Sequence, residues 1–148
     1  MTDLAYLEAF IAISDVKARY CHALDTKNWD AFAEVFTEDL ELDTRPSGGP
    51  LVKGRDEAIR MVSASLAGAK TSHQVHTPII TLNGDTADVI WAMQDRVVWG
   101  ERRPAPGLYG LTGYGQYHET YVRKDGRWRI AAQKLTRFHI DNDQEPVG

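Results

Sequence analysis

The sequence contains a single cysteine, Cys21, among its 148 residues. One thiol cannot form a disulfide within the chain, and without a cysteine pair the usual cysteine-based zinc sites are excluded. Long apolar runs are also missing, since none approaches the ~20 residues that span a bilayer. The first ten residues include the acidic Asp3 and Glu8, whereas a signal peptide would be basic and then apolar in this region. We therefore expect a soluble, cytoplasmic protein that is stabilised by packing.

Basic residues are not in excess either. Lys and Arg number 17 against 21 Asp and Glu, which gives a formal net charge of −4. Nucleic-acid binding normally requires a clustered basic surplus, so neither DNA nor RNA is expected as a partner. With 43% hydrophobic and 26% charged residues, the composition is that of one globular domain over residues 1–148. We expect the polar tail, residues 141–148, to be frayed.

The first half of the chain carries a helical period. Between Leu4 and Leu24, apolar side chains recur at steps of three and four, at Leu7, Phe10, Ile11, Val16, Tyr20 and Leu24. This spacing predicts an amphipathic helix. Asn28 is a suitable N-cap for a short second helix that continues through Phe36. Gly54 precedes a third helix, which is expected to bury Ile59, Val62 and Leu66 and to end at Gly68.

The second half changes to the period of a strand. Apolar residues alternate with more polar neighbours at Ala87, Val89, Trp91, Met93, Val97 and Trp99. An Asn83-Gly84 turn precedes this strand, and an Asp125-Gly126 turn joins two further strands at about 111–123 and 128–140. Helices followed by long antiparallel strands predict an α+β domain in which a curved, mainly antiparallel sheet wraps around three helices.

Asp95 falls on the apolar face of the strand that contains Trp91 and Met93. Burial without a partner would raise the pKa of this carboxyl group and make it a possible proton donor. Two alternatives remain open at this point: an ion pair with an arginine, or a bulge that turns the side chain outward.

Asp25 and His73 are the other candidates for acid–base chemistry. A carboxylate where the first helix ends opposes the helix dipole, at a cost of ~0.3–1 kcal/mol. Asp25 is therefore either a solvated turn residue or a buried carboxylate that orients an imidazole. His73 and His76 have metal-ligand spacing, but in a strand they point to opposite faces, so no metal site is expected. His73 is either a satisfied core residue or a base.

Several short motifs, in this order and spacing, resemble the SnoaL-like family of the nuclear-transport-factor-2-like superfamily. They are Tyr20 to Asp30, Phe36 to Asp39, Gly54-Arg55, Thr71 to His73, Gly84 to Ala87, Tyr117 to Glu119 and Asp125 to Ile130. The resemblance implies a conical α+β barrel, with three helices packed into a strongly bent sheet and an apolar pocket at the open end. It also implies a homodimer or a higher homo-oligomer.

Within that superfamily, the pattern is similar to scytalone dehydratase, bile acid 7-alpha-dehydratase and lindane dehydrochlorinase. The resemblance implies that Asp25 orients His73, that His73 removes a proton from carbon, and that Tyr20 and Asp95 act as acids or hydrogen-bond donors. The residues expected to contact the substrate are Trp91, Met93, Tyr117 and Arg137. Simple alternation places Arg137 opposite in direction to Trp128 and Ile130, which makes it the poorest match.

The sequence thus predicts a cofactor-independent lyase of the dehydratase type, acting on a hydrophobic polycyclic or aromatic substrate. One alternative is an isomerase or a polyketide-cyclase-like enzyme that uses the same proton abstraction. Another is a non-catalytic protein that binds a small ligand or resembles the beta subunit of aromatic-ring dioxygenases. The loop 100–107 joins two long strands and is expected to influence oligomer contacts or access to the pocket.

Overall fold

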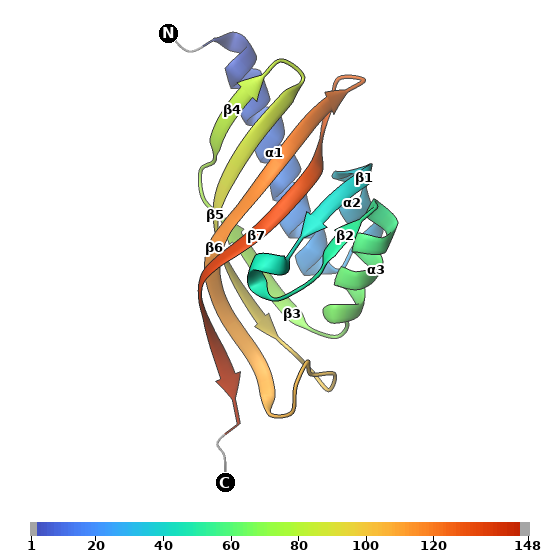
Figure 1. Cartoon of the computed structure of the whole chain (residues 1–148), viewed down its shortest axis with the longest axis vertical. Helices are drawn as coiled ribbons and strands as arrows, with labels where there is room; N and C mark the ends of the chain where they lie inside the picture. Colours follow the sequence, from blue (N-terminus) through green and yellow to red (C-terminus); the bar gives the residue numbers. More distant parts are fainter. Residues whose placement is uncertain (1–2, 146–148) are drawn as a thin grey trace.

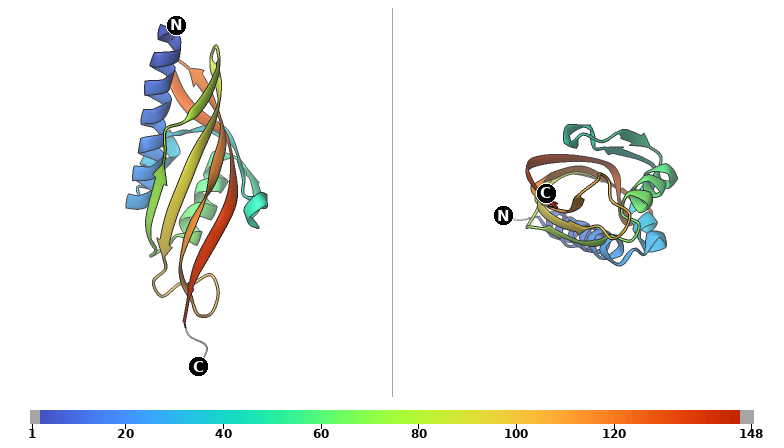
Figure 2. Two further views of the ribbon diagram at one scale, coloured as in Figure 1. Left: turned by 90° about the vertical axis from the view of Figure 1, so that its left-hand side faces the viewer. Right: turned by 90° about the horizontal axis from the view of Figure 1, so that it is seen from below.

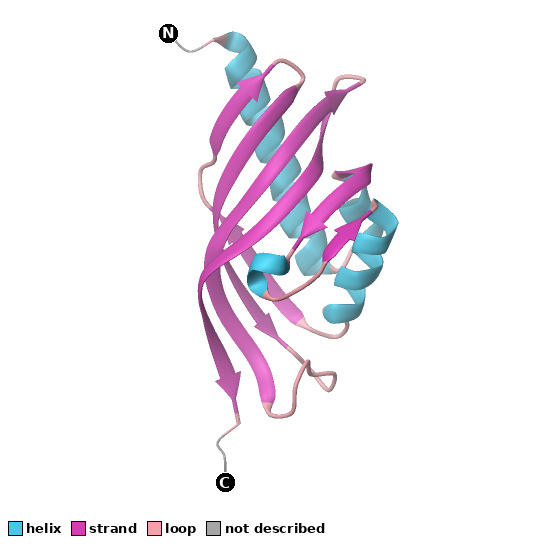
Figure 3. Ribbon diagram, in the orientation of Figure 1, coloured by secondary structure: helices cyan, strands magenta, loops and turns pink. Residues whose placement is uncertain are grey.

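The computed structural model describes residues 3–145 and contains three α-helices and seven strands (Figures 1 and 3). The elements in chain order are α1 (Leu4–Thr26), α2 (Trp29–Glu34), β1 (Phe36–Asp43), the 3-10 helix η1 (Arg45–Ser47), β2 (Leu51–Lys53), α3 (Arg55–Ser65), β3 (Lys70–Val75), β4 (Ile79–Asn83), β5 (Thr86–Val98), β6 (Leu108–Lys124) and β7 (Arg127–Gln144). The predicted order of helices followed by long strands is confirmed.

All seven strands belong to one strongly bent sheet. Its order is β2-β1-β7-β6-β5-β3, and β4 also pairs with β5. Every pairing is antiparallel except that of β1 with β7. The end view in Figure 2 shows the sheet curling around, with the helices along its open side. The α+β class is therefore confirmed, although the sheet remains an open cone because its path ends at β2 and β3.

Helix α1 supplies the wall that faces the sheet. The Asp3 side chain caps its first turn by accepting from the Ala5 backbone N–H. Its buried residues are Ala9, Ile13, Lys17, Tyr20, Ala23 and Leu24. The predicted apolar stripe was wrong at Leu7 and Ile11, which are 45% and 68% exposed. The buried stripe contains a lysine, and a search for apolar residues alone passes over it.

The short second helix ends earlier than predicted. Asn28 caps it through the Ala31 N–H, as expected, but α2 stops at Glu34 and Phe36 already belongs to β1. The reason is a pairing over a long distance in sequence: the N–H of Ile130 in β7 donates to the Val35 carbonyl. Parallel pairing with a distant strand determines the backbone of Phe36, and a local helical period cannot reveal it.

Strand β5 shows the predicted alternation along its whole length. Its inward side chains, all at most 5% exposed, are Ala87, Val89, Trp91, Met93, Asp95 and Val97. Trp99, at the end of the predicted series, lies just beyond the strand. The face that carries Asp95 is therefore the inside of the cone.

The expectation of a frayed tail was wrong for residues 141–144. They extend β7, where Thr112 pairs with Asp141 and Leu108 pairs with Gln144. Arg96 forms an ion pair with Asp143 at 2.5 Å, which ties this extension to β5. Residues 146–148 lie outside the described residues. The loop 100–107 contacts the same end of β7, because the Gly107 carbonyl accepts from the Glu145 N–H.

Candidate active site

Asp25 and His73 meet between the last turn of α1 and the middle of β3. The Asp25 Oδ1 atom lies 2.7 Å from His73 Nδ1, and Oδ2 accepts from the His73 backbone N–H at 2.9 Å. The Thr71 hydroxyl donates to Oδ1 at 2.9 Å. These three hydrogen bonds offset the unfavourable interaction of the carboxylate with the negative end of the helix dipole. The His73 side chain is only 7% exposed.

The electrostatics of Asp25 follow from these contacts. Burial would raise the pKa of its carboxyl group, but the hydrogen bonds from the His73 ring, the His73 backbone and Thr71 outweigh burial, so the pKa is lowered. A carboxylate can only accept, so Nδ1 of His73 carries the proton that lies between the two side chains. In neutral imidazole the Nε2 atom then has a free lone pair. It faces Asp95, whose Oδ2 atom is 4.0 Å away.

Asp95 forms an ion pair with Arg137, which is one of the two alternatives left open by the sequence. The Arg137 Nη1 and Nη2 atoms donate to the two carboxylate oxygens, each at 2.7 Å. This bidentate hydrogen bond raises the pKa of Arg137. Both oxygens of Asp95 accept from Arg137, so Asp95 serves here as an acceptor and not as the proton donor that an unpartnered, buried carboxyl group would be.

Arg137 points into the cone, contrary to simple alternation along β7. Its neighbour Gly115 belongs to the inward row of β6. The register of β7 shifts between Thr120 and Tyr121 of β6, and one extra residue, Ala131, lies in β7 at that point. A bulge of this kind reverses which side chains face inward, so Ile130 and Arg137 share one face of the sheet.

Gly113 makes the contact between Arg137 and Asp95 possible. It lies opposite Asp95 in the register of β5 and β6. A Cβ atom at this position would lie 2.2 Å from Arg137 Nη1 and 3.0 Å from Asp95 Oδ1. Glycines in this strand can bend the sheet, but at Gly113 the absent side chain leaves the room that the guanidinium occupies.

Tyr20, predicted to be catalytic, lies in the aromatic core. Its ring packs against Phe32, Phe36 and Tyr117, with centroids 5.1 to 5.8 Å apart. Its hydroxyl donates to Gln133 Oε1 at 3.2 Å, and burial raises its pKa. The hydroxyl of Tyr20 is thus hydrogen-bonded to the buried Gln133 side chain within the core.

The three other predicted contact residues, Trp91, Met93 and Tyr117, share the inward face with Asp95 but are only 2 to 3% exposed. Trp91 Nε1 donates to Glu119 at 3.1 Å. Burial raises the pKa of the Tyr117 hydroxyl, and the neighbouring Tyr20 and Asp95 raise it further. These side chains form the closed floor of the cone beneath the site.

Sequence reasoning missed a buried ion pair below that floor. Lys17 of α1 pairs with Glu119 of β6, and both side chains are completely buried. The ammonium group lies 3.7 and 3.8 Å from the ring centres of Tyr20 and Tyr117. Glu119 also accepts from Trp91, Tyr121 and Gln133, at 3.1, 2.6 and 2.7 Å. The signal that marked Asp95 could also have identified Glu119, because this charged residue alternates with the buried Tyr117 and Tyr121 along β6.

Beyond the site, three apolar side chains lie on the inner face of the sheet toward the open end. Val97 lies two residues after Asp95 and pairs with Leu111, while Ile140 pairs with Gly113. By alternation these three side chains follow the same face as Asp95. Ile140 is 38% exposed. This surface, formed by Val97, Leu111 and Ile140, was not singled out by the sequence.

Two cavities of about 490 and 730 Å³ lie elsewhere on the molecule. The first lies between α1, α2 and the β6–β7 turn, and the second lies beside β1 and the same turn. Neither includes Asp25, His73, Asp95 or Arg137 among its lining residues. Two pairs of charged lining residues, Arg19 with Asp15 and Arg127 with Glu34, form exposed ion pairs.

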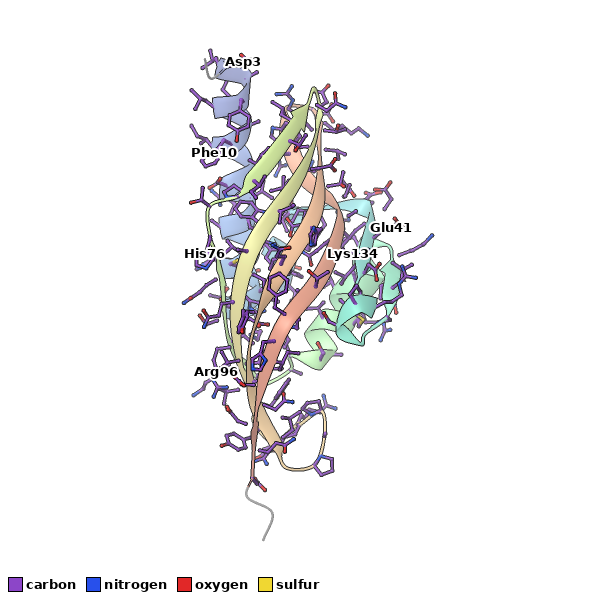
Figure 4. The ribbon with its side chains drawn as sticks, turned by 60° about the vertical axis from the view of Figure 1, so that its left-hand side comes forward. Asp3, Phe10, Glu41, His76, Arg96 and Lys134 are labelled. Carbon is purple, nitrogen blue, oxygen red and sulfur yellow. The ribbon has the colours of Figure 1, made fainter. Side chains whose placement is uncertain are left out.

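The described residues contain neither a cluster of metal ligands nor a membrane-spanning helix. Over residues 3–145, no group of three or more His, Cys, Asp or Glu side chains is arranged to hold a metal ion. His76 is exposed and lies beyond the end of β3, on the outside of the molecule in Figure 4. None of the helices in this part of the chain has the length and apolar character needed to cross a membrane.

The fold and the partly buried pair of Asp25 and His73 define a cone-shaped α+β protein in which a carboxylate holds an imidazole. A model of the SnoaL-like domain matches residues 5–134, and the chain belongs to this family. It is 25% identical to a probable cyclase, FGR4, of Gibberella zeae, over 89% of this chain and 93% of that protein.

Two solved structures have similar folds. A candidate scytalone dehydratase from Novosphingobium aromaticivorans is 25% identical, with a TM-score of 0.82 over 100% of this chain and 98% of that chain. A type 2 hexachlorocyclohexane dehydrochlorinase is 18% identical, with a TM-score of 0.81 over 95% and 93% of the two chains. The family and its structural neighbours thus include a dehydratase-like protein, a dehydrochlorinase and a probable cyclase.

Proposed function

We propose that the protein is a cofactor-independent lyase of the dehydratase type that removes a proton from carbon with His73. The observation that carries this proposal is the 2.7 Å contact between Asp25 Oδ1 and His73 Nδ1. It fixes the ring tautomer and leaves the Nε2 lone pair as the base. Once Nε2 takes a proton, the Asp25 carboxylate stabilises the imidazolium that forms.

In the proposed reaction, Nε2 takes a proton from a carbon next to a carbonyl group. The electrons of the C–H bond form a carbon–carbon double bond, and the bond to a β-hydroxyl breaks. The hydroxyl leaves as water after it receives a proton from the His73 imidazolium. Asp95 lies 4.0 Å from Nε2 and its oxygens accept from Arg137, so we assign it to orienting the substrate and the ring and not to supplying the proton.

We further propose that the substrate is hydrophobic and polycyclic or aromatic. Its apolar part would rest on Val97, Leu111 and Ile140 at the open end of the cone, with Met93 and Tyr117 beneath it. The core below is filled by Tyr20, Trp91 and the pair of Lys17 and Glu119, so the substrate enters from the side of Ile140.

The test replaces His73 by Ala and Asp25 by Asn and measures turnover of hydrophobic β-hydroxy ketones. Both variants should lose most of the activity, because one lacks the base and the other lacks the group that orients it. His139 and Asp141 form a matched His–Asp pair at 2.7 Å on the surface, so His139→Ala and Asp141→Asn should retain activity. Turnover that is unchanged in both His73→Ala and Asp25→Asn would remove the pair from the mechanism.

A cyclase or isomerase reaction is the second candidate, favoured by the 25% identity to a probable cyclase. The same base would remove the proton, and the carbanion would then be reprotonated or attack a carbonyl within the substrate. Mass spectrometry of the product separates simple isomerisation from dehydration, since only dehydration removes the mass of one water.

A further inference from the structure

Lys27 has a backbone conformation that a lysine rarely adopts. As the C-cap of α1 it has φ 59° and ψ 30°, in the left-handed region. Glycine is the usual residue there, because a Cβ atom is disfavoured in this region. Among residues 3–145, the only other non-glycine residue with positive φ is Asp125, whereas six glycines have positive φ. We therefore expect contacts of the Lys27 side chain to stabilise this unfavourable backbone conformation.

The Lys27 side chain connects the helix end to the candidate site. Its Nζ atom donates to the Leu24 carbonyl at 3.2 Å and to the Thr71 hydroxyl oxygen at 2.7 Å. The same hydroxyl donates to Asp25 Oδ1 at 2.9 Å. A hydroxyl has one proton, and an ammonium group can only donate. The direction of the chain is thus fixed, from Lys27 to Thr71 to Asp25.

We propose that Lys27 and Thr71 are positioning residues that hold the Asp25 carboxylate on the His73 ring. The Thr71 hydroxyl lies between the ammonium group of Lys27 and the carboxylate of Asp25, and it separates the two charges. A direct ion pair between Lys27 and Asp25 would compete for the Oδ1 lone pairs that hold His73 Nδ1–H. The role rests on the proposed function of the Asp25 and His73 pair, but the geometry of that pair can be measured without a substrate.

The first test compares Thr71→Val with Thr71→Ser by NMR of protein labelled with ¹⁵N-histidine. Valine has a similar shape but no hydroxyl, whereas serine keeps the hydroxyl. Thr71→Val should lose the hydrogen-bonded Nδ1 proton signal of His73, and Thr71→Ser should retain it. With an active substrate, Thr71→Val should lower kcat/KM about tenfold or more with little change in KM, the scale of one hydrogen bond to a charged group. A His73 signal in Thr71→Val identical to that of the wild type would overturn the proposal.

The second test makes stability and activity change in opposite directions. Lys27→Gly relieves the left-handed backbone and should leave the thermal midpoint equal or higher. If lysine served only as a cap, activity would not fall. We expect instead a weaker His73 Nδ1 signal and a lower kcat. Asp125→Gly is the matched control, because it relieves the same conformation at the β6–β7 turn and should leave the signal and the turnover unchanged.

The proposal and the proposed function fail separately. If Asp25→Asn and His73→Ala left turnover intact, the proposed reaction would be wrong, while the NMR comparison would still decide whether Thr71 and Lys27 position the pair. If Lys27→Gly and Thr71→Val behaved like the wild type in both measurements while Asp25→Asn was inactive, the positioning role would be wrong and the reaction would stand.

Discussion

Arg137 reaches Asp95 across strand β6, and its guanidinium group donates two hydrogen bonds of 2.7 Å to the carboxylate beside Gly113. The pair closes one side of the candidate site, since Asp95 Oδ2 lies 4.0 Å from His73 Nε2. The positive charge of Arg137 on β7 and the negative charge of Asp95 on β5 thereby neutralise each other on the inner face, where an unpaired carboxylate would be destabilising.

Gly113→Ala should disrupt this pair. The added Cβ would lie 2.2 Å from Arg137 Nη1, so the guanidinium must move and Asp95 loses at least one of its two bonds. We expect a loss of about 1–3 kcal/mol in the free energy of unfolding, typical of an overpacked interior, together with reduced turnover. Urea denaturation and kinetics would measure the two effects.

Gly100→Ala is the control for the alanine substitution itself. A Cβ there would meet only the Gly68 carbonyl oxygen, at 3.4 Å, and the free energy of unfolding should stay equal or rise slightly. If Gly113→Ala were as stable and as active as Gly100→Ala, the close approach of Arg137 would have no consequence for the site.

These residues also show what could be predicted from the sequence. The inward position of Asp95 followed from a period of two that β5 keeps without interruption. The inward position of Arg137 could not be predicted, because the bulge at Ala131 reverses the alternation and depends on the pairing with β6. Phe36 was assigned to a helix for a similar reason, since its strand pairs with β7, far away in the chain.

The pair of Asp25 and His73 was predicted from a family resemblance and not from the period of a strand. The resemblance to a family indicated Asp25 and His73, but sequence spacing cannot reveal their 2.7 Å contact or the third donor, Thr71, because α1 and β3 are far apart in the chain. Lys17 was missed because a pattern of apolar residues treats every lysine as exposed. A lysine four residues after Ile13 and three before Tyr20 lies within the buried stripe all the same.

Lys17→Met should be strongly destabilising. It leaves the Glu119 carboxylate fully buried without its cation, and removing one partner of a buried pair costs about 3–5 kcal/mol. Arg19→Met, two residues along α1, removes an exposed pair with Asp15 and should leave the free energy of unfolding almost unchanged. Urea denaturation would compare the free energies of unfolding of the two variants, provided that both show the same dependence on urea concentration.

The double variant Lys17→Met and Glu119→Gln separates the buried charge from lost packing. It removes both charges, and its free energy of unfolding should be higher than that of Lys17→Met alone. A Lys17→Met variant as stable as Arg19→Met would show that the pair contributes no more than a surface contact.

The pH dependence of stability provides a test of the Asp25 contacts. The pKa of Asp25 is lowered in the folded protein because the hydrogen bonds from His73 and Thr71 outweigh the effect of burial. The unfolded chain, with an ordinary aspartate pKa of about 3.9, then binds a proton more readily than the folded chain does. The contribution of Asp25 is fully present above that value, and it is lost as the pH falls through the folded pKa.

As the pH falls below the ordinary aspartate value of about 3.9, the wild type should therefore lose stability more steeply than Asp25→Asn, which has no carboxyl group to titrate at this position. Thr71→Val removes one of the hydrogen bonds that lower the pKa, so its slope should lie between the two. Urea denaturation at a series of pH values gives these slopes, and the difference between variants cancels the contributions of the other carboxyl groups. Parallel curves for the wild type and Asp25→Asn would mean that the Asp25 carboxylate is no better stabilised in the folded protein than in the unfolded chain.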